Sequence, residues 1–562
     1  MKVRFHLLGE SALTVELGDR ISPAINTRVH ALHAALAAVP LPGLIESAPA
    51  YRSLTLYYDP LTLTVADLES WVREHVESLP AHADVVGQSH TIPVAYGGEH
   101  GPDLVSVAEE TALAPEQVIA EHCRPTYRVY MLGFSPGFPY LGRTSLRLNV
   151  KRLATPRTRV PAGSVAIAGR QTGLYPSSTP GGWRLIGRTH WRFFDPMRMP
   201  PARLQPGDQV RFCPVTPDEL SASDPDWGQA ATPGPIAGQS VIEVLDAGLL
   251  TTVQDAGRFG FQSFGVPISG AMDSAAMRAA NLLVGNLPQA PVLEITLAGP
   301  RLRFLQDALI AVTGADLGLW IEWPDGRRWE LPGWMTIYLR RGSELGFGSR
   351  QAGCRAYLSV AGGFRVAQVL GSASTCLSGA FGGHSGRRLQ AGDCLMAETA
   401  SGDVGLRAGR SWPVPLRPRY ANRVEVRVLP GPQWRQFTRE ARASFLATEY
   451  QVQPASDRVG LRLKGAALPR RIVTEVISSG VTMGSVQAPV DGQPIVLMAD
   501  RQTAGGYAQI ADVIGADLAL LAQLTPGDRV SFKQVTLEQA VDALRQQRRN
   551  EQMAGRALGL LV

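Results

Sequence analysis

Short apolar runs separated by Gly- and Pro-rich turns fill most of the chain, and they predict many short β-strands. Four of these turns carry Gly-Asp or Gly-Ser directly before an alternating apolar run, at PGDQVRF (206–212), RGSELGF (341–347), AGDCLMA (391–397) and PGDRVSF (526–532). Regular strands of this kind are typical of closed or nearly closed β-barrels, which leave no open sheet edge. The pattern therefore predicts a mainly β protein.

Helical periodicity is confined to a few segments. Residues 1–85 mix strand-like runs with two helix patterns, SPAINTRVHALHAALAAV and TVADLESWVREHVESL, and Ser22 before Pro23 resembles a helix start. This order favours a small α/β domain with a split βαβ layout. Short helices are also expected at SVAEETAL and APEQVIAEHC, and a helix with a fraying end is expected in the tail.

Composition shifts along the chain indicate its domain organisation. We predict an α/β domain at 1–85, a β domain at 86–215, a linker at 216–240, a β-rich region of two subdomains at 241–533 and a helical tail at 534–562. The linker stretch is rich in Pro, Gly and Ser and poor in apolar residues. The length of 562 residues also exceeds what one hydrophobic core supports.

One phrase occurs twice, about 330 residues apart. VAIAGRQTGLYP (165–176) resembles VLMADRQTAGGYA (496–508), and the closing phrases LQPGDQVRF (204–212) and LTPGDRVSF (524–532) nearly match. The repeat predicts two related β-rich halves, each presenting a polar edge: Arg170, Gln171 and Thr172 in one, Arg501, Gln502 and Thr503 in the other. Our hypothesis is that both Arg-Gln-Thr corners face one solvent-accessible cleft that cradles a planar amide.

Charge and cysteine content narrow the function classes. The net charge is +6, and nearly all basic residues are Arg because only four lysines are present, so a lysine-based covalent mechanism has few candidates. The basic residues are not clustered, which argues against nucleic-acid binding. The five widely spaced cysteines and the absence of a long apolar N-terminal run favour a reduced, cytoplasmic protein without a membrane span.

Four segments concentrate candidate site residues. In 169–189, Arg170, Arg184 and Arg188 lie among Gly, Ser and Thr, which suits a carboxylate or phosphate, although a structural β-hairpin fits equally well. In 130–142, three aromatics alternate with Gly and Pro and either line an apolar slot or fill a barrel end. In 249–286, Asp255 and Arg258 precede a helix that Ser269 or Asp273 could cap, so a structural role competes with anion binding.

The fourth segment, 478–513, has the densest polar content. Asp500 is a candidate acid or base with Arg501 as an electrostatic clamp, and Asp457-Arg458 could join them from a neighbouring strand, although Asp–Arg neighbours more often form structural pairs. The catalytic candidates are Arg170, Asp491, Asp500 and Arg501, and the substrate-binding candidates are Gln171, Thr172, Tyr175, Gln493, Gln502, Thr503 and Tyr507. Secondary candidates are Arg188, Asp255, Arg258, Asp273, Asp457 and Arg458.

Several familiar motifs are missing from the sequence. It has no GxxxxGK[ST] phosphate loop, no HExxH or other His/Cys metal spacing, no GxSxG elbow and no Ala-Met-Lys-Met biotin-attachment sequence. We therefore expect no metal site, and ATP or biotin chemistry would need an unconventional pocket or a partner protein.

Long segments of the chain resemble two related families. PVAYGGEHGPDL, MLGFSPGFPYLG and VAIAGRQTGLYPSSTPGGWRLIGRT resemble allophanate hydrolase subunit 1, which is also called the 5-oxoprolinase B subunit. LLTTVQDAGRFGFQSFGVPISGAMD, SDRVGLRL and DGQPIVLMADRQTAGGYAQIA resemble allophanate hydrolase subunit 2, or the 5-oxoprolinase C subunit. The resemblance covers nearly all of 1–535 and is joined at the predicted linker, and the tail carries no family signal.

This resemblance implies cyclophilin-like β-barrels in both halves and a component of an ATP-dependent enzyme. The expected reaction opens 5-oxoproline to L-glutamate with ATP, together with Mg²⁺, and with a separate LamB/YcsF-type A subunit as partner. The same modules resemble the carboxyltransferase part of urea carboxylase, so a biotin-dependent carboxyltransferase acting on urea or a related amide is one alternative. A histidine-kinase inhibitor is another, and a homo-oligomer is also compatible with the sequence.

Overall fold

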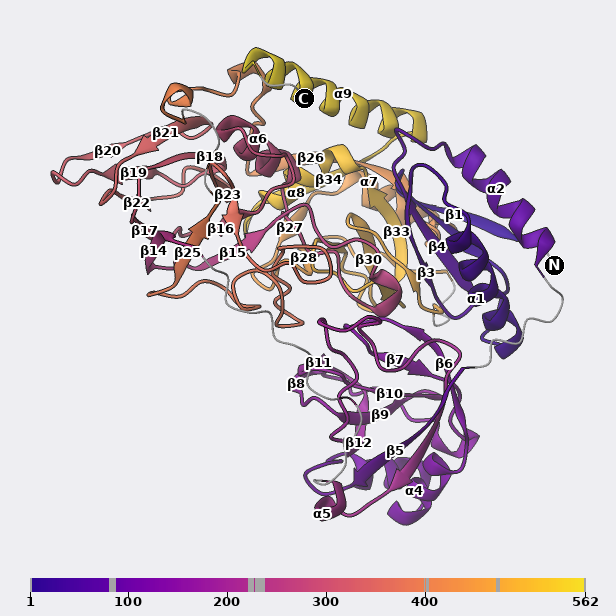
Figure 1. Ribbon diagram of the computed structural model, residues 1–562. Helices are drawn as coiled ribbons and strands as arrows, with labels where there is room; N and C mark the ends of the chain where they lie inside the picture. The colour runs from indigo at the N-terminus through magenta and orange to yellow at the C-terminus, as the bar shows by residue number, and fades with distance from the viewer. Residues whose placement is uncertain are drawn as a thin grey trace.

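The computed structural model describes residues 3–79, 87–220, 227, 238–398, 400, 404–471 and 476–559. Two lobes are visible in Figure 1: a lower lobe formed by residues near 87–215, and a larger upper body that contains the rest of the chain. The prediction of a mainly β protein with a barrel in each half and an α/β N-terminal domain is confirmed. The predicted linker lies largely outside the described residues.

The N-terminal domain is a four-stranded antiparallel sheet with two helices. Its strand order is β1-β2-β4-β3. The first strand-like run, RFHLLGESALTVEL, forms a hairpin of two strands, and Gly9 adopts a positive φ of 64° at its turn. The elements are β1 (Arg4–Leu8), β2 (Ala12–Glu16), α1 (Pro23–Ala38), β3 (Leu44–Pro49), β4 (Ser53–Tyr58) and α2 (Val65–Ser78).

The lower lobe is a closed seven-stranded barrel, called barrel 1 below. The predicted helices α3 (Leu104–Thr111) and α4 (Pro115–Cys123) lie in it. Its strands are β5 (Ser89–Tyr96), β6 (Tyr127–Leu132), β7 (Pro139–Leu141), β9 (Ser164–Ala168), β10 (Gln171–Leu174), β12 (Arg184–Arg188) and β13 (Gln209–Pro214). A small two-stranded antiparallel sheet of β8 (Arg157–Val160) and β11 (Thr179–Gly181) lies beside it.

Two packed sheets, called the sandwich below, begin the second half. They enclose an apolar core, and α6 (Ser274–Val284) packs on the five-stranded sheet. That sheet contains β15 (Leu250–Gln254), β16 (Val292–Thr296), β18 (Ala308–Asp316), β21 (Met335–Leu339) and β23 (Ala352–Val360). The seven-stranded sheet contains β14 (Ser240–Asp246), β17 (Arg301–Phe304), β19 (Leu319–Glu322), β20 (Arg328–Glu330), β22 (Glu344–Phe347), β24 (Phe364–Arg365) and β25 (Cys394–Ala397).

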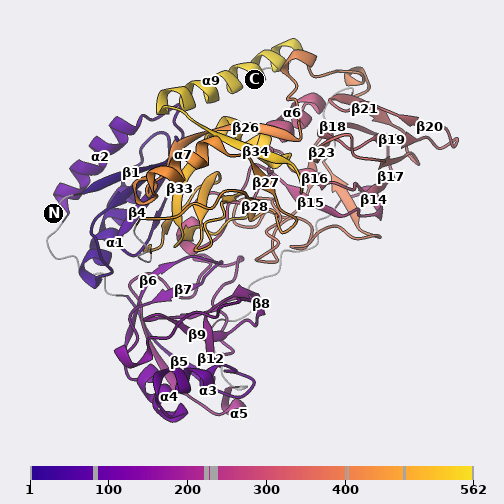
Figure 2. The ribbon, with the colours of Figure 1, turned by 180° about the vertical axis from the view of Figure 1, so that it is seen from behind.

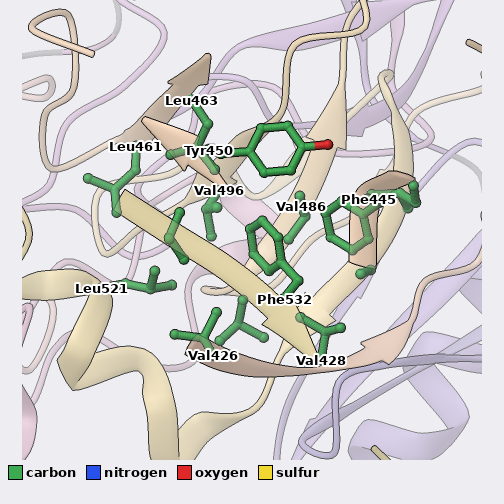
Figure 3. Close-up of a cluster of buried hydrophobic side chains, with 14 of the residues drawn as sticks. Val426, Val428, Phe445, Tyr450, Leu461, Leu463, Val486, Val496, Leu521 and Phe532 are labelled. Carbon is green, nitrogen blue, oxygen red and sulfur yellow. The ribbon is translucent and has the colours of Figure 1, made fainter. Parts of the chain in front are cut away.

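Barrel 2 closes the second half. Phe445 of α7 (Arg439–Ala447) stacks on Phe532 in its core, with ring centroids 4.4 Å apart (Figure 3). Its strands are β26 (Arg423–Pro430), β27 (Tyr450–Val452), β28 (Gly460–Lys464), β30 (Ser485–Ala488), β31 (Ile495–Leu497), β33 (Ala508–Val513) and β34 (Arg529–Gln534). A two-stranded flap of β29 (Ser479–Gly480) and β32 (Ala504–Gly505) extends from it, and α8 (Leu518–Ala522) follows β33.

The two barrels share one topology. In each, the first strand pairs in parallel with the last, β5 with β13 and β26 with β34, and the remaining strands follow in the same order. The two PGD phrases lead into the equivalent strands β13 and β34. The two Arg-Gln-Thr phrases are not equivalent: Arg170 lies in the β9–β10 turn, whereas Arg501 follows β31, the counterpart of β10. The interpretation of these phrases as matching strand ends was therefore wrong.

The C-terminal segment forms a long helix that contacts two distant parts of the chain. In Figures 1 and 2, α9 (Leu537–Ala557) lies along the upper body between the N-terminal domain and α6. Arg278 of α6 donates to Glu551 through Nε (3.0 Å) and Nη2 (2.6 Å), and Arg548 lies 3.5 Å from Asp59 of the N-terminal domain. The expected tail is thus packed over most of its length.

Asp512 lies buried where the N-terminal domain meets barrel 2. Its Oδ1 accepts hydrogen bonds from Ser485 Oγ (2.8 Å), Gln509 Nε2 (2.6 Å) and Thr482 Oγ1 (3.2 Å), while Oδ2 has no partner. Burial raises the pKa of Asp512 to about 6. Nearby, Glu10 accepts from Gly515 N at 2.6 Å, and burial raises its pKa as well.

Asp512→Asn is expected to stabilise the protein about twice as much at pH 8 as at pH 5. A carboxyl whose folded pKa lies above its unfolded value of about 3.9 contributes stability below that value and loses it as the pH rises through 6. Asn avoids that loss, so we expect a gain of about 1–3 kcal/mol at pH 8. Urea denaturation at both pH values measures the effect, with Asp325→Asn on an exposed hairpin as control. Equal gains at pH 5 and pH 8 would contradict the assignment.

Candidate functional site

Asp500 and Arg458 form a buried ion pair at the start of the second Arg-Gln-Thr corner. Arg458 donates from Nε to Asp500 Oδ2 (2.9 Å) and from Nη2 to Oδ1 (3.1 Å). It also donates to Glu294 on the sandwich and to the Gly270 carbonyl (2.8 Å). Arg458 is 3% exposed and Glu294 1% exposed. These contacts fix the corner against the sandwich.

The same network continues to Asp273 at the start of α6. Glu294 Oε2 accepts from Tyr357 Oη (2.9 Å), and the Tyr357 hydroxyl oxygen accepts from Asp273 N (2.7 Å). Asp273 caps α6 through Ala276 N (2.9 Å) and accepts from Tyr420 Oη and Gln523 Nε2, both at 2.9 Å. Burial raises the pKa of Asp273. The structure thus joins three candidates, Asp273, Arg458 and Asp500, in one saturated interior network that ties the sandwich to barrel 2.

Arg501 lies where three parts of the chain meet. It donates from Nη2 to Gln262 Oε1 (3.2 Å) and from Nε to the Val481 carbonyl (3.4 Å). Gln262 in turn donates from N and Nε2 to Glu46 of the N-terminal domain, both at 3.0 Å. Tyr57 Oη also donates to the Val481 carbonyl (3.1 Å).

In the part of the chain that the structure describes, Arg501 is a buried arginine whose charge is not balanced by a contacting carboxylate. Burial lowers the pKa of Arg501 and raises that of Glu46, and no carboxylate among the described residues forms an ion pair with the guanidinium. Within the described residues, Arg501 Nη1 has no hydrogen-bond partner. Arg501 is 3% exposed, so this nitrogen is a buried donor that is not used within the protein.

The first corner, in barrel 1, contacts a different residue of the N-terminal domain. Gln171 donates to Tyr51 Oη, in the turn before β4. Arg170 donates from Nη2 to the Thr144 carbonyl (3.4 Å), and its Nε has no partner. Arg170 is half-buried and, in the described part of the chain, forms no ion pair with a carboxylate. It is a second guanidinium with unused donors.

His122 positions Thr172 inside barrel 1. Its Nε2 lies 2.9 Å from Thr172 Oγ1, and its Nδ1 lies 2.8 Å from Tyr96 Oη. Burial lowers the pKa of His122 to about 3, so the ring is neutral at physiological pH. Thr172 is therefore a fixed interior residue rather than an exposed contact.

The two corners approach the same small sheet without touching each other. Gln171 contacts Tyr51 before β4, and the carbonyl bound by Arg501 also accepts from Tyr57 near the end of β4. Within the described ranges, no hydrogen bond or ion pair links Arg170–Thr172 to Arg501–Thr503. The N-terminal domain is the element that the two corners share.

Aromatic side chains form the end of barrel 1 that faces barrel 2. Phe138 packs edge-on against Phe134 (5.3 Å between centroids) and Tyr175 (5.2 Å), and Ala504 of the flap packs on the same cluster. Phe134 is 37% exposed and adopts a positive φ of 67°. The aromatic segment 130–142 thus fills a barrel end, with Phe134 left partly open. Tyr175 is buried in this cluster.

The remaining candidates lie in several different places. Asp457 is exposed and accepts from Val459 N (2.8 Å), and Asp491 accepts from Gln493 N (3.1 Å) in the exposed β30–β31 turn. Arg188 donates to the Ala162 carbonyl (3.0 Å). Near the flap, Gln502 is half-buried, Thr503 is buried and Tyr507 is 46% exposed. Asp255 and Arg258 are buried together in the loop before α6.

Sequence reasoning missed the residues that hold the two corners in place. Glu46 and Tyr57 link the halves, and Tyr51 and His122 hold the first corner, yet none was a candidate; only Gln262 lay inside a quoted motif. The described residues contain no group of three His, Cys, Asp or Glu side chains that could hold a metal ion. Nor is any of their helices both long and apolar enough to cross a membrane.

Family comparisons cover both halves of the chain. Residues 3–204 match the family described as carboxyltransferase domain, subdomain C and D, and residues 264–534 match carboxyltransferase domain, subdomain A and B. The chain is 41% identical over 317 residues to the 5-oxoprolinase C subunit of Escherichia coli, covering 56% of this chain and 98% of that protein. It is 43% identical over 238 residues to the 5-oxoprolinase B subunit of Bacillus subtilis, covering 40% and 98%.

A solved structure shares the whole arrangement. The crystal structure of TTHA0988 is 37% identical in sequence, with a TM-score of 0.79, and the match covers 95% of this chain and 100% of that one. The fusion of both halves in one polypeptide is therefore seen in a second protein.

Proposed function

Because this chain belongs to the family of the B and C subunits of 5-oxoprolinase, we propose that it is a fused B–C component of an ATP-dependent 5-oxoprolinase. The proposed reaction opens 5-oxo-L-proline to L-glutamate with hydrolysis of ATP, together with a separate LamB/YcsF-type A subunit. The observation that carries this proposal is the near-complete match to one B-type and one C-type subunit, in order, on one chain.

The geometry of the junction supports a shared site for the two halves. Arg501 belongs to the C half, and its contacts reach Gln262 of the same half and, through it, Glu46 of the B half. A site at this point is complete only when both halves are present. This explains why a fusion, which keeps both halves at equal amounts, suits the activity.

The chemistry of a lactam requires donors around its carbonyl oxygen. The nitrogen lone pair delocalises into the carbonyl, so attack on the carbon builds negative charge on oxygen. Arg501 Nη1 and the unused donors of Arg170 are assigned to stabilise that charge. Asp500, whose two oxygens accept from Arg458, is a positioning residue for the corner rather than a free base.

ATP and Mg²⁺ are assigned to the complex rather than to named residues of this chain. The sequence has no Walker-type loop, and the described residues offer no three-ligand metal cluster. The residues above are therefore assigned to the amide substrate alone.

Reconstitution tests the proposal. The purified chain, the A-type partner, ATP and Mg²⁺ are expected to release glutamate from 5-oxoproline, measured by amino-acid analysis, and omission of any one component should abolish the release. Glutamate absent under every condition, with all proteins folded, would reject the proposal.

The family description favours a second function. Both matching families are carboxyltransferase subdomains, so the chain could transfer a carboxyl group from biotin to urea or a related amide. Biotin is a cofactor only under this alternative. Carboxylation of urea from carboxybiotin by a preparation that releases no glutamate would support it.

A further inference from the structure

Arg258 is buried in the loop between β15 and α6, and no carboxylate in the described part of the chain forms an ion pair with it. Its side chain is 0% exposed. Nε donates to the Val369 carbonyl and Nη2 to the Ser374 carbonyl, both at 2.8 Å, and the guanidinium lies 4.9 Å from the centre of the Phe381 ring. Nη1 has no hydrogen-bond partner. Two nitrogens and one ring face of the group are thus engaged, and Nη1 is buried with its donors unused.

Arg458 is a buried arginine of the same half whose guanidinium nitrogens all have partners. It is almost as deeply buried, and two carboxylates and a carbonyl occupy its donors. Leaving a buried charged donor unpaired costs more than leaving a neutral one unpaired. The unused Nη1 of Arg258 would be satisfied by an anionic ligand.

The acids near Arg258 are already occupied. Asp255 accepts from Ser372 Oγ (2.7 Å), Ala373 N (2.6 Å) and Gly257 N (2.8 Å), and both oxygens of Asp500 accept from Arg458. Neither forms an ion pair with Arg258. Any ligand of Nη1 must therefore come from outside these pairs.

A second unpartnered donor lies on the facing segment of the same loop. Arg258 N donates to the Ile268 carbonyl (2.7 Å), which places Ser269 beside Arg258 across the loop. Ser269 is 5% exposed, its Oγ has no partner, and its φ of 57° is a strained value for a non-glycine residue. Such strain persists where surrounding contacts hold it and is common at ligand sites.

Residues next in sequence to Arg258 and to the neighbouring Cys376 are exposed to solvent. Phe259, next to Arg258, is 46% exposed, and Leu377, next to the neighbouring Cys376, is 36% exposed. Both loops also contact barrel 1, through Phe264 and through Phe381 with Phe194. The two loops around Arg258 thus lie in the zone where the two halves meet.

We propose that Arg258 Nη1, together with Ser269 Oγ, binds the carboxylate group of the substrate. The proposal rests on the proposed function, because 5-oxoproline carries a carboxylate on the ring carbon beside the lactam nitrogen. Arg258 then anchors the substrate, while Arg501 and Arg170 act on the lactam carbonyl. A charged hydrogen bond of this kind changes affinity about 10- to 100-fold.

Binding and turnover are compared for two ligands that differ only in the carboxylate. Affinity for 5-oxoproline and for pyrrolidin-2-one is measured by calorimetry on the intact chain and on the reconstituted complex. Arg258→Gln is expected to weaken 5-oxoproline binding, and to raise its KM, about 10- to 100-fold, with pyrrolidin-2-one unaffected. Arg328→Gln, which removes a guanidinium stacked 3.7 Å from the Trp320 ring, serves as the matched control.

The possible results distinguish carboxylate binding by Arg258 from the proposed 5-oxoprolinase reaction. Wild-type affinity for 5-oxoproline in Arg258→Gln, or equal losses for both ligands, would overturn the anchor even if glutamate is released. Arg258-dependent carboxylate binding without any glutamate release would support the anchor while rejecting the proposed function. If Arg258→Gln does not fold, Ser269→Ala decides: a selective loss for 5-oxoproline supports the site, and unchanged affinity overturns it.

Discussion

Replacing Arg458 by methionine is expected to lower the free energy of unfolding by about 3–5 kcal/mol, because it leaves the buried carboxylate of Asp500 unpaired and removes the nearest charged partner of Glu294. Asp500 is 7% exposed and accepts from Arg458 through both oxygens, whereas Glu294 keeps Tyr357 Oη (2.9 Å), Met272 N (2.8 Å) and Arg355 Nε at 3.9 Å. Methionine fills similar apolar volume, so the loss reports the unpaired charge rather than a cavity. Urea denaturation followed by circular dichroism measures the change.

A surface pair provides the matched comparison. Arg423 contacts Glu449 with equally good geometry, with Nη2 to Oε2 at 2.8 Å, but its side chain is 68% exposed. Arg423→Met is expected to change stability by less than about 1 kcal/mol, as exposed ion pairs do. Adding Asp500→Asn to Arg458→Met should recover part of the lost stability, because it removes the unpaired charge. Similar losses for Arg458→Met and Arg423→Met would contradict the network's role.

Local patterns predicted the elements that local physics determines. The Gly-Asp turns at 206–212 and 526–532 lead into β13 and β34, and the short helices expected near 106–123 are α3 and α4. A positive-φ glycine followed by alternating apolar residues specifies a turn and a strand with little help from the rest of the fold. The same reasoning identified two related barrels from a repeated closing phrase.

The repeated Arg-Gln-Thr motif shows a limit of predicting strand positions from short sequence repeats. Arg170 and Arg501 follow similar apolar runs, yet they lie after non-equivalent strands, β9 and β31. Sequence similarity over a few residues does not fix strand register, because register depends on which strands pair around the barrel. The topology, and not the phrase, decides which positions correspond.

Contacts between segments far apart in the sequence could not be predicted from local sequence patterns either. Glu46 and Gln262 are 216 positions apart, and nothing in either neighbourhood points to the other. The sequence does not distinguish the candidates Asp273, Arg458 and Asp500 from Arg258. In the fold, the first three belong to one hydrogen-bonded network. Arg258 keeps a nitrogen without a partner. Burial and partner count, which separate these cases, are properties of the tertiary structure.

Replacing Arg501 by alanine is expected to reduce kcat/KM for ATP-dependent glutamate release about 10²- to 10³-fold, as loss of a charge-stabilising donor does in other acyl-transfer sites. The reason is its place at the junction: Nε and Nη2 are held by Val481 and Gln262, so Nη1 is fixed in direction before substrate arrives. A donor that is already oriented stabilises developing charge without reorganisation. Steady-state rates of the reconstituted complex at saturating ATP measure the loss.

The variant Tyr57→Phe tests whether Arg501 acts on the substrate or only stabilises the junction between the halves. That variant removes the other donor to the Val481 carbonyl and leaves the guanidinium in place. It should cost about 1 kcal/mol of stability, the worth of one hydrogen bond, and should change kcat/KM only a few-fold. If Tyr57→Phe lost as much activity as Arg501→Ala, the arginine would act by holding the junction together. If Arg501→Ala turned over at the wild-type rate with its fold intact, the residue would have no part in the mechanism, and Arg170 would be the remaining donor for the lactam oxygen.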